Sequence, residues 1–470
     1  MQNKPCIVGI DFGTTSLSAV IINVDNIRIE KVFNYNTDAY IPFPESYRKE
    51  QSVEKLTSLF RQLLDEINAM EGVDIQAYGF TGQMHGIIGL NKKKEAVTNL
   101  VTWQDRSGEI VLSNGVTLLD EIKKLTNTET LANGYGIVTL YKWLNYDKRN
   151  DIDSFCTVAD YFARLLTDNK QEVAMSPTMA HSIGLFDTYT NDWHHECIND
   201  LKLGAITFPE IKDNSHIIGY AGNVPVVCAI GDNQSSFLGS VTNKHESILL
   251  NVGTGTQLSF LIGKDEIGVY KKYIDGFETQ LRPFDNYYYL AATSFVSGGS
   301  VYDALFNFFR EVGTNLFNIE NPDKKSLWEN MEKTARENLK KRNTLSVSPL
   351  LEGQRKNTTK KGSVTNLTTA NFHPENLILG FLEGLADYYK TGYFPELENR
   401  IKYICGSGNG LKKNVLFADI IQDAFRHPLY LTPYNEEAAV GAVVNAAMAT
   451  GVVKNEVESQ IFLTKLSENI

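Results

Sequence analysis

The chain is poor in cysteine. Its 470 residues contain five, at scattered positions: Cys6, Cys156, Cys197, Cys228 and Cys405. The number is odd and no pair has the C-x-x-C spacing, which argues against a disulfide framework and against a zinc site. Three of the five stand in apolar, strand-like runs, where a thiol behaves as a small hydrophobic side chain. We therefore expect a reducing environment.

The chain also lacks an excess of positive charge and any long apolar run. Its formal net charge is −11, with 45 Lys and Arg against 56 Asp and Glu, which disfavours a nucleic-acid-binding surface. No segment approaches the apolar length of a membrane span. The N-terminal residues show neither the basic nor the apolar region of a secretory signal. The sequence predicts a cytoplasmic protein that binds no nucleic acid and no membrane.

The hydrophobic content of 42% is enough for large buried cores, and 470 residues exceed what one core holds, so two or three domains are expected. Apolar residues recur at helical spacing over residues 53–67. Short apolar runs at 77–80, 226–230, 248–252 and 401–405 are each followed by glycine within two residues. This alternation predicts an α/β protein with mixed or parallel sheets.

Residues 9–16 run from the end of an apolar strand into a tight turn. Gly13 has no side chain, so backbone N–H groups there can approach an anion closely. Hydroxyl donors follow at three positions: Thr14, Thr15 and Ser16. Asp11 stands at the strand end, where a carboxylate can hold a hydrated Mg²⁺. These residues together predict a site for a polyphosphate and its metal.

A second turn of this kind follows the apolar run 248–252 and has the sequence Gly253, Thr254, Gly255, Thr256. Two strand–turn phosphate sites in one chain predict two related lobes that close on one nucleotide. The alternative is that both are ordinary hairpin turns, in which glycine and threonine are common.

Three stretches are predicted as connections. Residues 241–245 precede the second phosphate turn and mark the boundary between the lobes. Residues 321–325 are predicted as a turn and the polar residues 354–369 as a surface loop, whose geometry the sequence leaves open.

Further motifs follow in order along the chain. In the first half they are 81–86 (TGQMHG), 102–106 (TWQDR) and 231–234 (GDNQ). In the second half they are 297–299 (SGG), 349–355 (PLLEGQR), 406–408 (GSG) with Asn414 after it, and 436–442 (EEAAVGA). Each motif alone is a weak signal, whereas the joint order is specific.

This set of motifs covers nearly the whole chain and resembles the FGGY carbohydrate kinases, a family within the actin-like ATPase group. The resemblance implies a two-lobed, actin-like (ribonuclease H-like) ATPase fold with an interlobe cleft. It implies an N-terminal lobe over residues 1–242 that binds sugar and carries the first phosphate motif. The implied C-terminal lobe, residues 243–470, binds the nucleotide.

The resemblance also implies roles for individual residues. Asp232 is implied as the catalytic base and Asp11 as the metal-binding residue, with ATP and Mg²⁺ as cofactors. The implied substrate-binding residues are Gln83, Met84, His85, Trp103, Gln104, Asp105 and Asn233. The implied nucleotide-binding residues are Gly13, Thr14, Thr15, Ser16, Gly253, Thr254, Gly255, Gly298, Gly299, Gly406, Gly408 and Asn414.

Several of these residues also have a purely structural reading. Asp232 can take the proton of a sugar hydroxyl, but a Gly-Asp-Asn sequence also suits a turn or a helix cap. His85 can bind a sugar hydroxyl or serve as a satisfied structural histidine. Trp103 offers an apolar face to a sugar ring or packs into a core. Tyr135 is a weaker pocket candidate that also suits a turn.

The motifs also bear on the substrate. Residues 83–85 favour a ketose over glycerol, and Trp103 to Asp105 resemble sedoheptulokinases, whereas Asn233 resembles xylulokinases. The resemblance implies conversion of sedoheptulose to sedoheptulose 7-phosphate, with xylulose to xylulose 5-phosphate as the alternative. A non-kinase actin-like ATPase and a catalytically silent sugar sensor are the alternatives from other classes. The oligomeric state, including a homodimer, and any regulation stay open.

Overall fold

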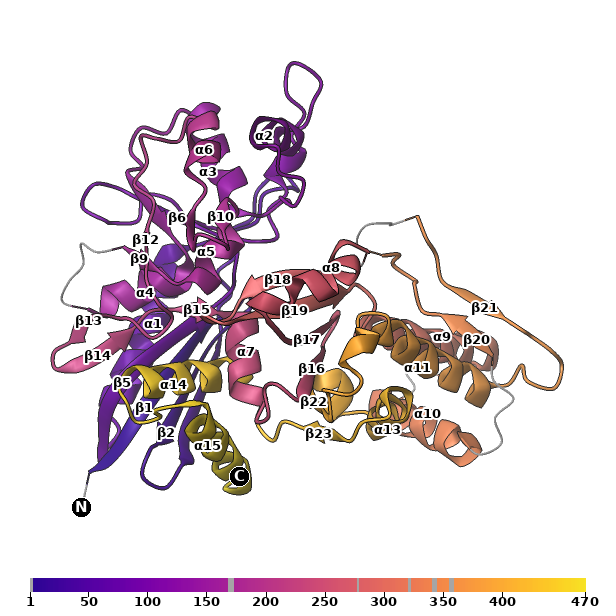
Figure 1. The fold of residues 1–470 in the computed structure, drawn as a ribbon. Helices are drawn as coiled ribbons and strands as arrows, with labels where there is room; N and C mark the ends of the chain where they lie inside the picture. The colour runs from indigo at the N-terminus through magenta and orange to yellow at the C-terminus, as the bar shows by residue number, and fades with distance from the viewer. Residues whose placement is uncertain (1–2, 168–172, 277–278, 320–322, 340–344, 355–358) are drawn as a thin grey trace. The chain divides into compact units, whose positions relative to one another are not determined.

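The computed structural model describes residues 3–167, 173–276, 279–319, 323–339, 345–354 and 359–470 (Figure 1). By packing, the chain divides into two compact units. The first comprises Met1–Thr242, Pro283–Asn286 and Glu436–Ile470, and the second Asn243–Arg282 and Tyr287–Asn435. The last part of the chain thus returns to the first unit. The division of function between 1–242 and 243–470 stays a prediction.

The first unit is built on a seven-stranded mixed sheet. Its strands run in the order β13-β14-β5-β1-β2-β3, and β15 extends the end of β14 beside β5. β1 pairs antiparallel with β2 and parallel with β5. The bounds are β1 Lys4–Phe12, β2 Ser16–Asn23, β3 Arg28–Asn36, β5 Val73–Gly82, β13 Ile217–Ala221, β14 Val224–Val227 and β15 Ile230–Gly231.

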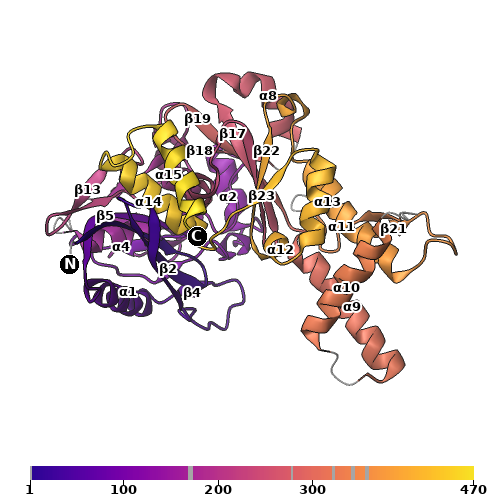
Figure 2. The ribbon, with the colours of Figure 1, turned by 90° about the horizontal axis from the view of Figure 1, so that it is seen from below.

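Helices cover both faces of this sheet, which explains why its central strands are almost continuously apolar. Side chains of a strand alternate between its two faces. Val8, Ile10 and Phe12 therefore share one face of β1, and Gly9 lies on the other. The face that carries Phe12 meets α1 (Val53–Asn68) and α4 (Val158–Leu166), where the rings of Phe12 and Phe162 stack at 4.4 Å. α14 (Glu437–Ala449) crosses the other face, contacting β1, β2 and β5 (Figure 2).

Shorter elements complete the first unit. The strands are β4 Glu50–Gln51, β6 Ile88–Leu90, β7 Leu100–Val101, β8 Ser154–Cys156, β9 Ala174–Met175, β10 Phe186–Asp187, β11 Asp192–Trp193 and β12 Glu210–Ile211. The helices are α2 Leu118–Thr126, α3 Gly136–Asn145, α5 Pro177–Ile183, α6 His195–Asp200, α7 Asp232–Ser240 and α15 Glu456–Glu468. α7 packs on α14, and the Ser235 hydroxyl donates to Ala438 O at 2.7 Å.

The second unit repeats the local pattern on a six-stranded sheet ordered β18-β19-β17-β16-β22-β23. β16 pairs antiparallel with β17 and parallel with β22, as β1 does with β2 and β5. The bounds are β16 Ser247–Val252, β17 Thr256–Gly263, β18 Thr279–Pro283, β19 Tyr288–Phe295, β22 Tyr403–Ser407 and β23 Leu429–Leu431.

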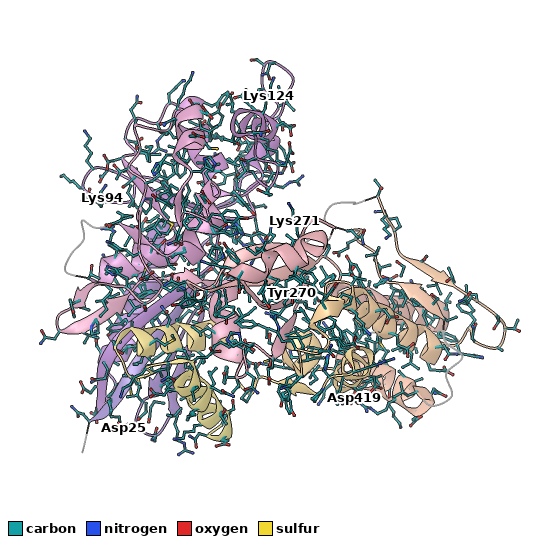
Figure 3. The ribbon with its side chains drawn as sticks, in the orientation of Figure 1. Asp25, Lys94, Lys124, Tyr270, Lys271 and Asp419 are labelled. Atoms are coloured by element: carbon teal, nitrogen blue, oxygen red, sulfur yellow. The ribbon has the colours of Figure 1, made fainter. Side chains whose placement is uncertain are left out.

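Helices and one small hairpin pack with this second sheet. The helices are α8 Ile267–Gly276, α9 Gly299–Phe317, α10 Lys324–Asn338, α11 Pro374–Lys390, α12 Asn409–Lys412 and α13 Val415–Phe425. The hairpin is β20 (Ser346–Ser348) with β21 (Ser363–Thr365). Tyr270 of α8, labelled in Figure 3, is buried with its ring 5.7 Å from that of Phe394.

The predicted α/β class and the predicted helix and strands are confirmed. Helix 53–67 is α1, and the apolar runs fall in β5, β14 to β15, β16 and β22. The loop prediction for 354–369 is wrong in part, because residues 363–365 form β21; residues 355–358 lie outside the described residues. Of the predicted turn at 321–325, residues 321 and 322 also lie outside them. No helix in the described part is long and apolar enough to cross a membrane.

Candidate active site

Three neighbouring strands of the first unit end together and carry the predicted catalytic and metal residues. In the parallel pairing of β1 and β5, Asp11 lies opposite Thr81. In the pairing of β15 and β5, Gly231 lies opposite Gly82. Gln83 directly follows the end of β5, and Asp232 directly follows the end of β15. The side chains of Asp11, Gln83 and Asp232 therefore belong to one edge of the sheet. The carboxyl edge of parallel strands is where α/β sheets bind ligands.

Asp11 is the most electrostatically perturbed residue of this edge. Burial, together with the charges of Asp232 and Glu436, raises the pKa of the Asp11 carboxyl to about 8. Its Oδ1 atom is buried and has no hydrogen-bond partner among the described residues. An orphaned buried carboxylate oxygen near two other acids fits a cation. A single carboxylate can hold a hydrated Mg²⁺ through its water ligands, and this role of Asp11 stays a prediction.

Asp232 is the first residue of α7, and the N-cap position belongs to Gly231. The helix-capping interpretation of Asp232 is therefore wrong. Its Oδ1 accepts a hydrogen bond from Asn233 Nδ2 at 3.0 Å. The helix is fixed within the unit by Ser235 and by Gln234, whose Nε2 donates to Pro283 O at 2.9 Å. A carboxylate at the first turn of an anchored helix is held in a defined direction.

The turn 81–86, predicted to bind sugar and called the sugar-side turn below, places His85 in a strained conformation. His85 has φ +74°, and Gly86 N donates to Met84 O at 2.9 Å, which together describe a tight three-residue turn. The His85 N–H donates to Ser182 Oγ at 3.0 Å, and its Nδ1 lies 2.7 Å from Ser182 O. Because a carbonyl oxygen only accepts, Nδ1 carries the hydrogen, and Nε2 is the acceptor of the neutral ring.

The ring of His85 stacks on that of Tyr135 at 4.6 Å, so the structure brings Tyr135 to this turn. Met84 is buried, and a Cβ added to Gly231 would lie 2.9 Å from its sulfur atom. Met84 therefore packs the sugar-side turn against the start of the Asp232 helix. The predicted contact of Met84 with a sugar stays a prediction.

The loop 102–105 reaches the first phosphate turn. Trp103 is 45% exposed, so the core-packing interpretation of this side chain is wrong. Its indole Nε1 donates to Thr14 Oγ1 at 3.0 Å. Gln104 Oε1 accepts from the Tyr40 hydroxyl at 2.7 Å. The predicted sugar-binding and phosphate-binding residues Trp103 and Thr14 are thus in direct contact.

Asp105 is positioned differently from its neighbours. Its carboxylate accepts from Lys49 N at 3.0 Å and from Ser107 N at 2.8 Å, and the residue is buried. It also lines a cavity of about 600 Å³ together with Arg48 and Lys142. The carboxylate thus organises the loop backbone, and its predicted contact with a sugar stays a prediction.

In the second unit, the turn 253–255 interlocks with the start of α9. Gly299 N donates to Gly253 O at 2.8 Å, and Ser300 N donates to Thr254 O at 3.2 Å. A Cβ at Gly298 would lie 2.5 Å from Thr254 O, so this approach requires glycine. The predicted nucleotide-binding glycines of both segments therefore meet at a helix N-terminus, a place that suits phosphate.

The remaining predicted nucleotide residues follow β22. Gly408 has φ +82°, and a Cβ there would lie 2.4 Å from Val252 O, the last residue of β16. This places the 406–408 turn against the end of the strand that leads into the second phosphate turn. Asn414 caps α13, its Oδ1 accepting from Phe417 N at 2.9 Å. Its predicted contact with the adenosine stays a prediction.

Comparison with known proteins assigns this arrangement to a family. The N-terminal domain of the FGGY family of carbohydrate kinases matches residues 6–239, and the C-terminal domain of that family matches residues 249–450. The chain belongs to the FGGY family of carbohydrate kinases. The predicted family, the predicted two-domain actin-like fold and the predicted enzyme class, an ATP-dependent carbohydrate kinase, are thereby confirmed.

Individual relatives of this FGGY kinase act on different substrates. It is 22% identical to the sedoheptulokinase of Mus musculus, over 94% of this chain and 98% of the relative. Its fold matches the xylulose kinase from Lactobacillus acidophilus with a TM-score of 0.73 at 19% identity, covering 97% and 92% of the two chains. It matches the Plasmodium falciparum glycerol kinase with ADP at 0.76 and 18% identity, covering 99% and 94%.

Two residues of the kinase that sequence reasoning gave no role belong to this site. Glu436 acts on the pKa of Asp11 and accepts from Asn34 Nδ2 at 2.9 Å through its Oε1. The motif 436–442 contained it, but proximity to Asp11 is not visible in the sequence. Gln51 donates from Nε2 to Thr14 O at 2.6 Å and lies in no motif.

Proposed function

We propose that this FGGY kinase transfers the γ-phosphate of ATP to a hydroxyl group of a ketose, and that the ketose is sedoheptulose. The product is then sedoheptulose 7-phosphate. The observation that carries the reaction is the shared sheet edge of Asp11, Gln83 and Asp232 in the first unit. The choice of sugar is supported by residues 102–105 and by the match to a sedoheptulokinase over 94% of the chain.

In this proposal Asp232 is the general base. Its carboxylate accepts the proton of the sugar hydroxyl as that oxygen forms a bond to the γ-phosphorus. The bond between the γ-phosphorus and the bridging oxygen then breaks, and ADP leaves. Asn233 and Ser235 lie in the same first turns of α7, where the bonds of Asn233 to the carboxylate and of Ser235 to Ala438 hold its direction.

The sugar is proposed to bind the turn and loop that carry Gln83, His85, Trp103 and Gln104. In the tautomer that donates from Nδ1 to Ser182 O, His85 Nε2 can accept a sugar hydroxyl, and the exposed face of Trp103 packs on the sugar ring. Met84, Asp105 and Asn233 then support these groups.

Each unit is proposed to carry a phosphate-binding turn. Residues 13–16 of the first unit and 254–255 and 298 of the second offer backbone N–H and hydroxyl groups to phosphate, with Gly253 and Gly299 shaping the second turn. In the second unit, Gly406, Gly408 and Asn414 are proposed to receive the adenosine. Mg²⁺ held through water by Asp11 would neutralise the phosphate charge. The buried, unpartnered Oδ1 of Asp11 supports this assignment.

A panel of sugars tests the proposal. ADP release is measured with ATP and Mg²⁺ in the presence of sedoheptulose, xylulose, gluconate and glycerol, each against a no-sugar control. Sedoheptulose is expected to give the highest kcat/KM. A higher value for xylulose would establish the alternative substrate, which Asn233 favours. Hydrolysis independent of sugar would indicate a non-kinase ATPase, and sugar binding without turnover would indicate a sensor.

A further inference from the structure

Gln51 is a buried carboxamide at the end of β4, and it links two parts of the proposed site. Its side chain is 0% exposed. Its Nε2 donates to Thr14 O at 2.6 Å, and its Oε1 accepts from Gln83 Nε2 at 2.9 Å. Gln83 Nε2 also lies 3.4 Å from Gly13 O, and the Gln83 N–H donates to Phe12 O at 2.8 Å. The first phosphate turn and the sugar-side turn are therefore joined through two amide side chains.

The chemistry of the partners fixes the orientation of both amides. Thr14 O is a carbonyl oxygen, so Gln51 must present its NH₂ group to it. Gln51 then presents its oxygen to Gln83, so Gln83 must present its NH₂ group in return. Gly13 O demands the same orientation of Gln83. The orientations of both amide groups therefore follow from the main-chain carbonyl groups that they contact.

The relay leaves one acceptor unused. Gln83 is 2% exposed, and its Oε1 is buried without a hydrogen-bond partner among the described residues. A buried polar atom without a partner destabilises the folded state, so a site of this kind is expected to gain a donor when its ligand binds. The hydroxyl group of a sugar is such a donor.

The strand that carries Gln51 also supports the second sugar-side segment. Gln51 pairs with Leu100 of β7, and Lys49 O accepts from both the N–H and the Oγ1 hydroxyl of Thr102, at 2.9 and 3.0 Å. Trp103 follows at once and donates to Thr14 Oγ1. Two sets of contacts therefore connect the region of Gln51 with Thr14, one to its carbonyl oxygen and one to its hydroxyl group.

We propose that Gln51 is a positioning residue for phosphoryl transfer. It sets the orientation of the Gln83 amide, so that Oε1 is the acceptor for a sugar hydroxyl, and it holds the carbonyl groups of the first phosphate turn. This inference rests on the proposed function, because that function assigns sugar to Gln83 and phosphate to residues 13–16. Gln51 itself contacts neither.

Two substitutions of Gln51 test whether it orients the Gln83 amide or only fills space. Gln51→Leu removes both hydrogen bonds at similar volume, and we expect kcat/KM for the sugar to fall about 10- to 100-fold. Gln51→Glu keeps the shape but, when ionised, places an acceptor against Thr14 O, and we expect a loss at least as large at pH 8.5.

The Gln51→Glu variant gives a readout that packing alone would not move. A protonated carboxyl has one O–H donor and one acceptor oxygen, which matches the polarity of the amide. Burial raises the pKa of a carboxyl, so protonation is reached within a usable pH range. The activity of Gln51→Glu relative to wild type is therefore expected to rise roughly fivefold or more between pH 8.5 and pH 5.5. The same ratio for Gln51→Leu should stay flat.

Asn23→Leu is the matched control. Asn23 is another buried amide of the first unit, at the end of β2 away from the first phosphate turn, where its Oδ1 accepts from Asp25 N at 3.0 Å. We expect it to lower the melting temperature without changing sugar kinetics. Gln51→Leu and Gln83→Leu should be non-additive when combined, whereas Gln51→Leu and Asn23→Leu should be additive.

The possible outcomes separate failure of the proposed function from failure of the role assigned to Gln51. A wild-type protein that phosphorylates no sugar overturns the proposed function and this inference with it. A wild-type kinase whose Gln51 variants keep normal kinetics overturns the inference alone. A flat pH ratio for Gln51→Glu, with reduced activity in both variants, reduces Gln51 to a packing residue. If Gln51→Leu does not fold, the pH ratio of Gln51→Glu still decides.

Discussion

The two phosphate turns share a local topology but are held by different groups. Each joins an antiparallel strand pair whose first strand has a parallel neighbour, β1 with β5 and β16 with β22. Three side chains bind the first turn, those of Gln51, Gln83 and Trp103, and the Thr37 N–H also donates to Thr15 O at 2.9 Å. The second is bound by backbone N–H groups of Gly299 and Ser300.

The two phosphate turns therefore depend on different kinds of residues. The first turn depends on the side chains of Gln51, Gln83 and Trp103. The second turn depends on glycines that let two stretches of backbone approach closely. Burial also raises the pKa of two carboxyls of the first unit, those of Asp11 and Asp160.

The largest expected effect tests whether proton transfer belongs to the first unit. Asp232→Ala should lower kcat about 10²- to 10⁴-fold, because general-base assistance is lost, and should leave the KM for ATP near normal. Steady-state kinetics and thermal melting of the purified variant check this. Wild-type kcat with wild-type melting would remove Asp232 from the catalytic role.

The next effect concerns the metal. Asp11→Asn should raise the Mg²⁺ concentration for half-maximal activity roughly 10- to 100-fold, the usual cost of losing an outer-shell metal partner, and should lower kcat. A Mg²⁺ titration at saturating ATP measures this. Asp25→Asn, in the exposed turn between β2 and β3, is the control and should titrate like wild type. Equal titrations for both variants would place the metal elsewhere.

The buried acids of the first unit predict a dependence of stability on pH. Burial raises the pKa of the Asp160 carboxyl from 3.8 to about 7. The folded protein then binds more protons than the unfolded chain between these values, so this group lowers stability as pH rises from about 4 to about 7. Its contribution to the slope is at most about 1.4 kcal/mol per pH unit. Denaturant unfolding of Asp160→Asn between pH 5 and pH 8 should show a flatter profile, and parallel profiles would contradict the assignment.

Substitutions of His85 and Asp105 distinguish a residue that binds sugar from one that also organises its loop. His85→Ala should raise the sugar KM about 2- to 10-fold, the worth of one neutral hydrogen bond, with little change in melting temperature. Asp105→Ala should raise the sugar KM at least as much, and it should also lower the melting temperature by a few degrees, because Lys49 N and Ser107 N lose their acceptor. Unchanged sugar kinetics in both variants would place the pocket elsewhere.

The smallest effect compares the two turns directly. Thr14→Val and Thr254→Val each remove one hydroxyl from a phosphate turn, and each should raise the KM for ATP by about 2- to 10-fold. Only Thr14→Val should also raise the KM for sugar, because Thr14 Oγ1 is the partner of Trp103. A sugar effect of Thr254→Val alone would reverse the proposed assignment of the turns.

Much of the fold was predictable because its signals are local. The apolar strand β1 and the turn that follows it are contiguous in the sequence, and so is the helical pattern of α1. The hairpin β20–β21 was not predictable, since its strands are short and polar and their pairing joins residues 346–348 with 363–365. Asn414 shows the same limit within the site, because its position as a helix cap depends on where α13 begins.

The sequence by itself determined the α/β class and the positions of the strand-end motifs, because these rest on residues adjacent in the chain. It also determined the family, through the order of those motifs along the chain. Only the tertiary structure decided which of those motifs touch. Gln51 meets Thr14 across 37 positions and Gln83 across 32, and Glu436 acts on Asp11 from the far end of the chain. Strand pairing sets these contacts, and hydrogen bonds and charges reach a few ångströms in space whatever the separation in sequence.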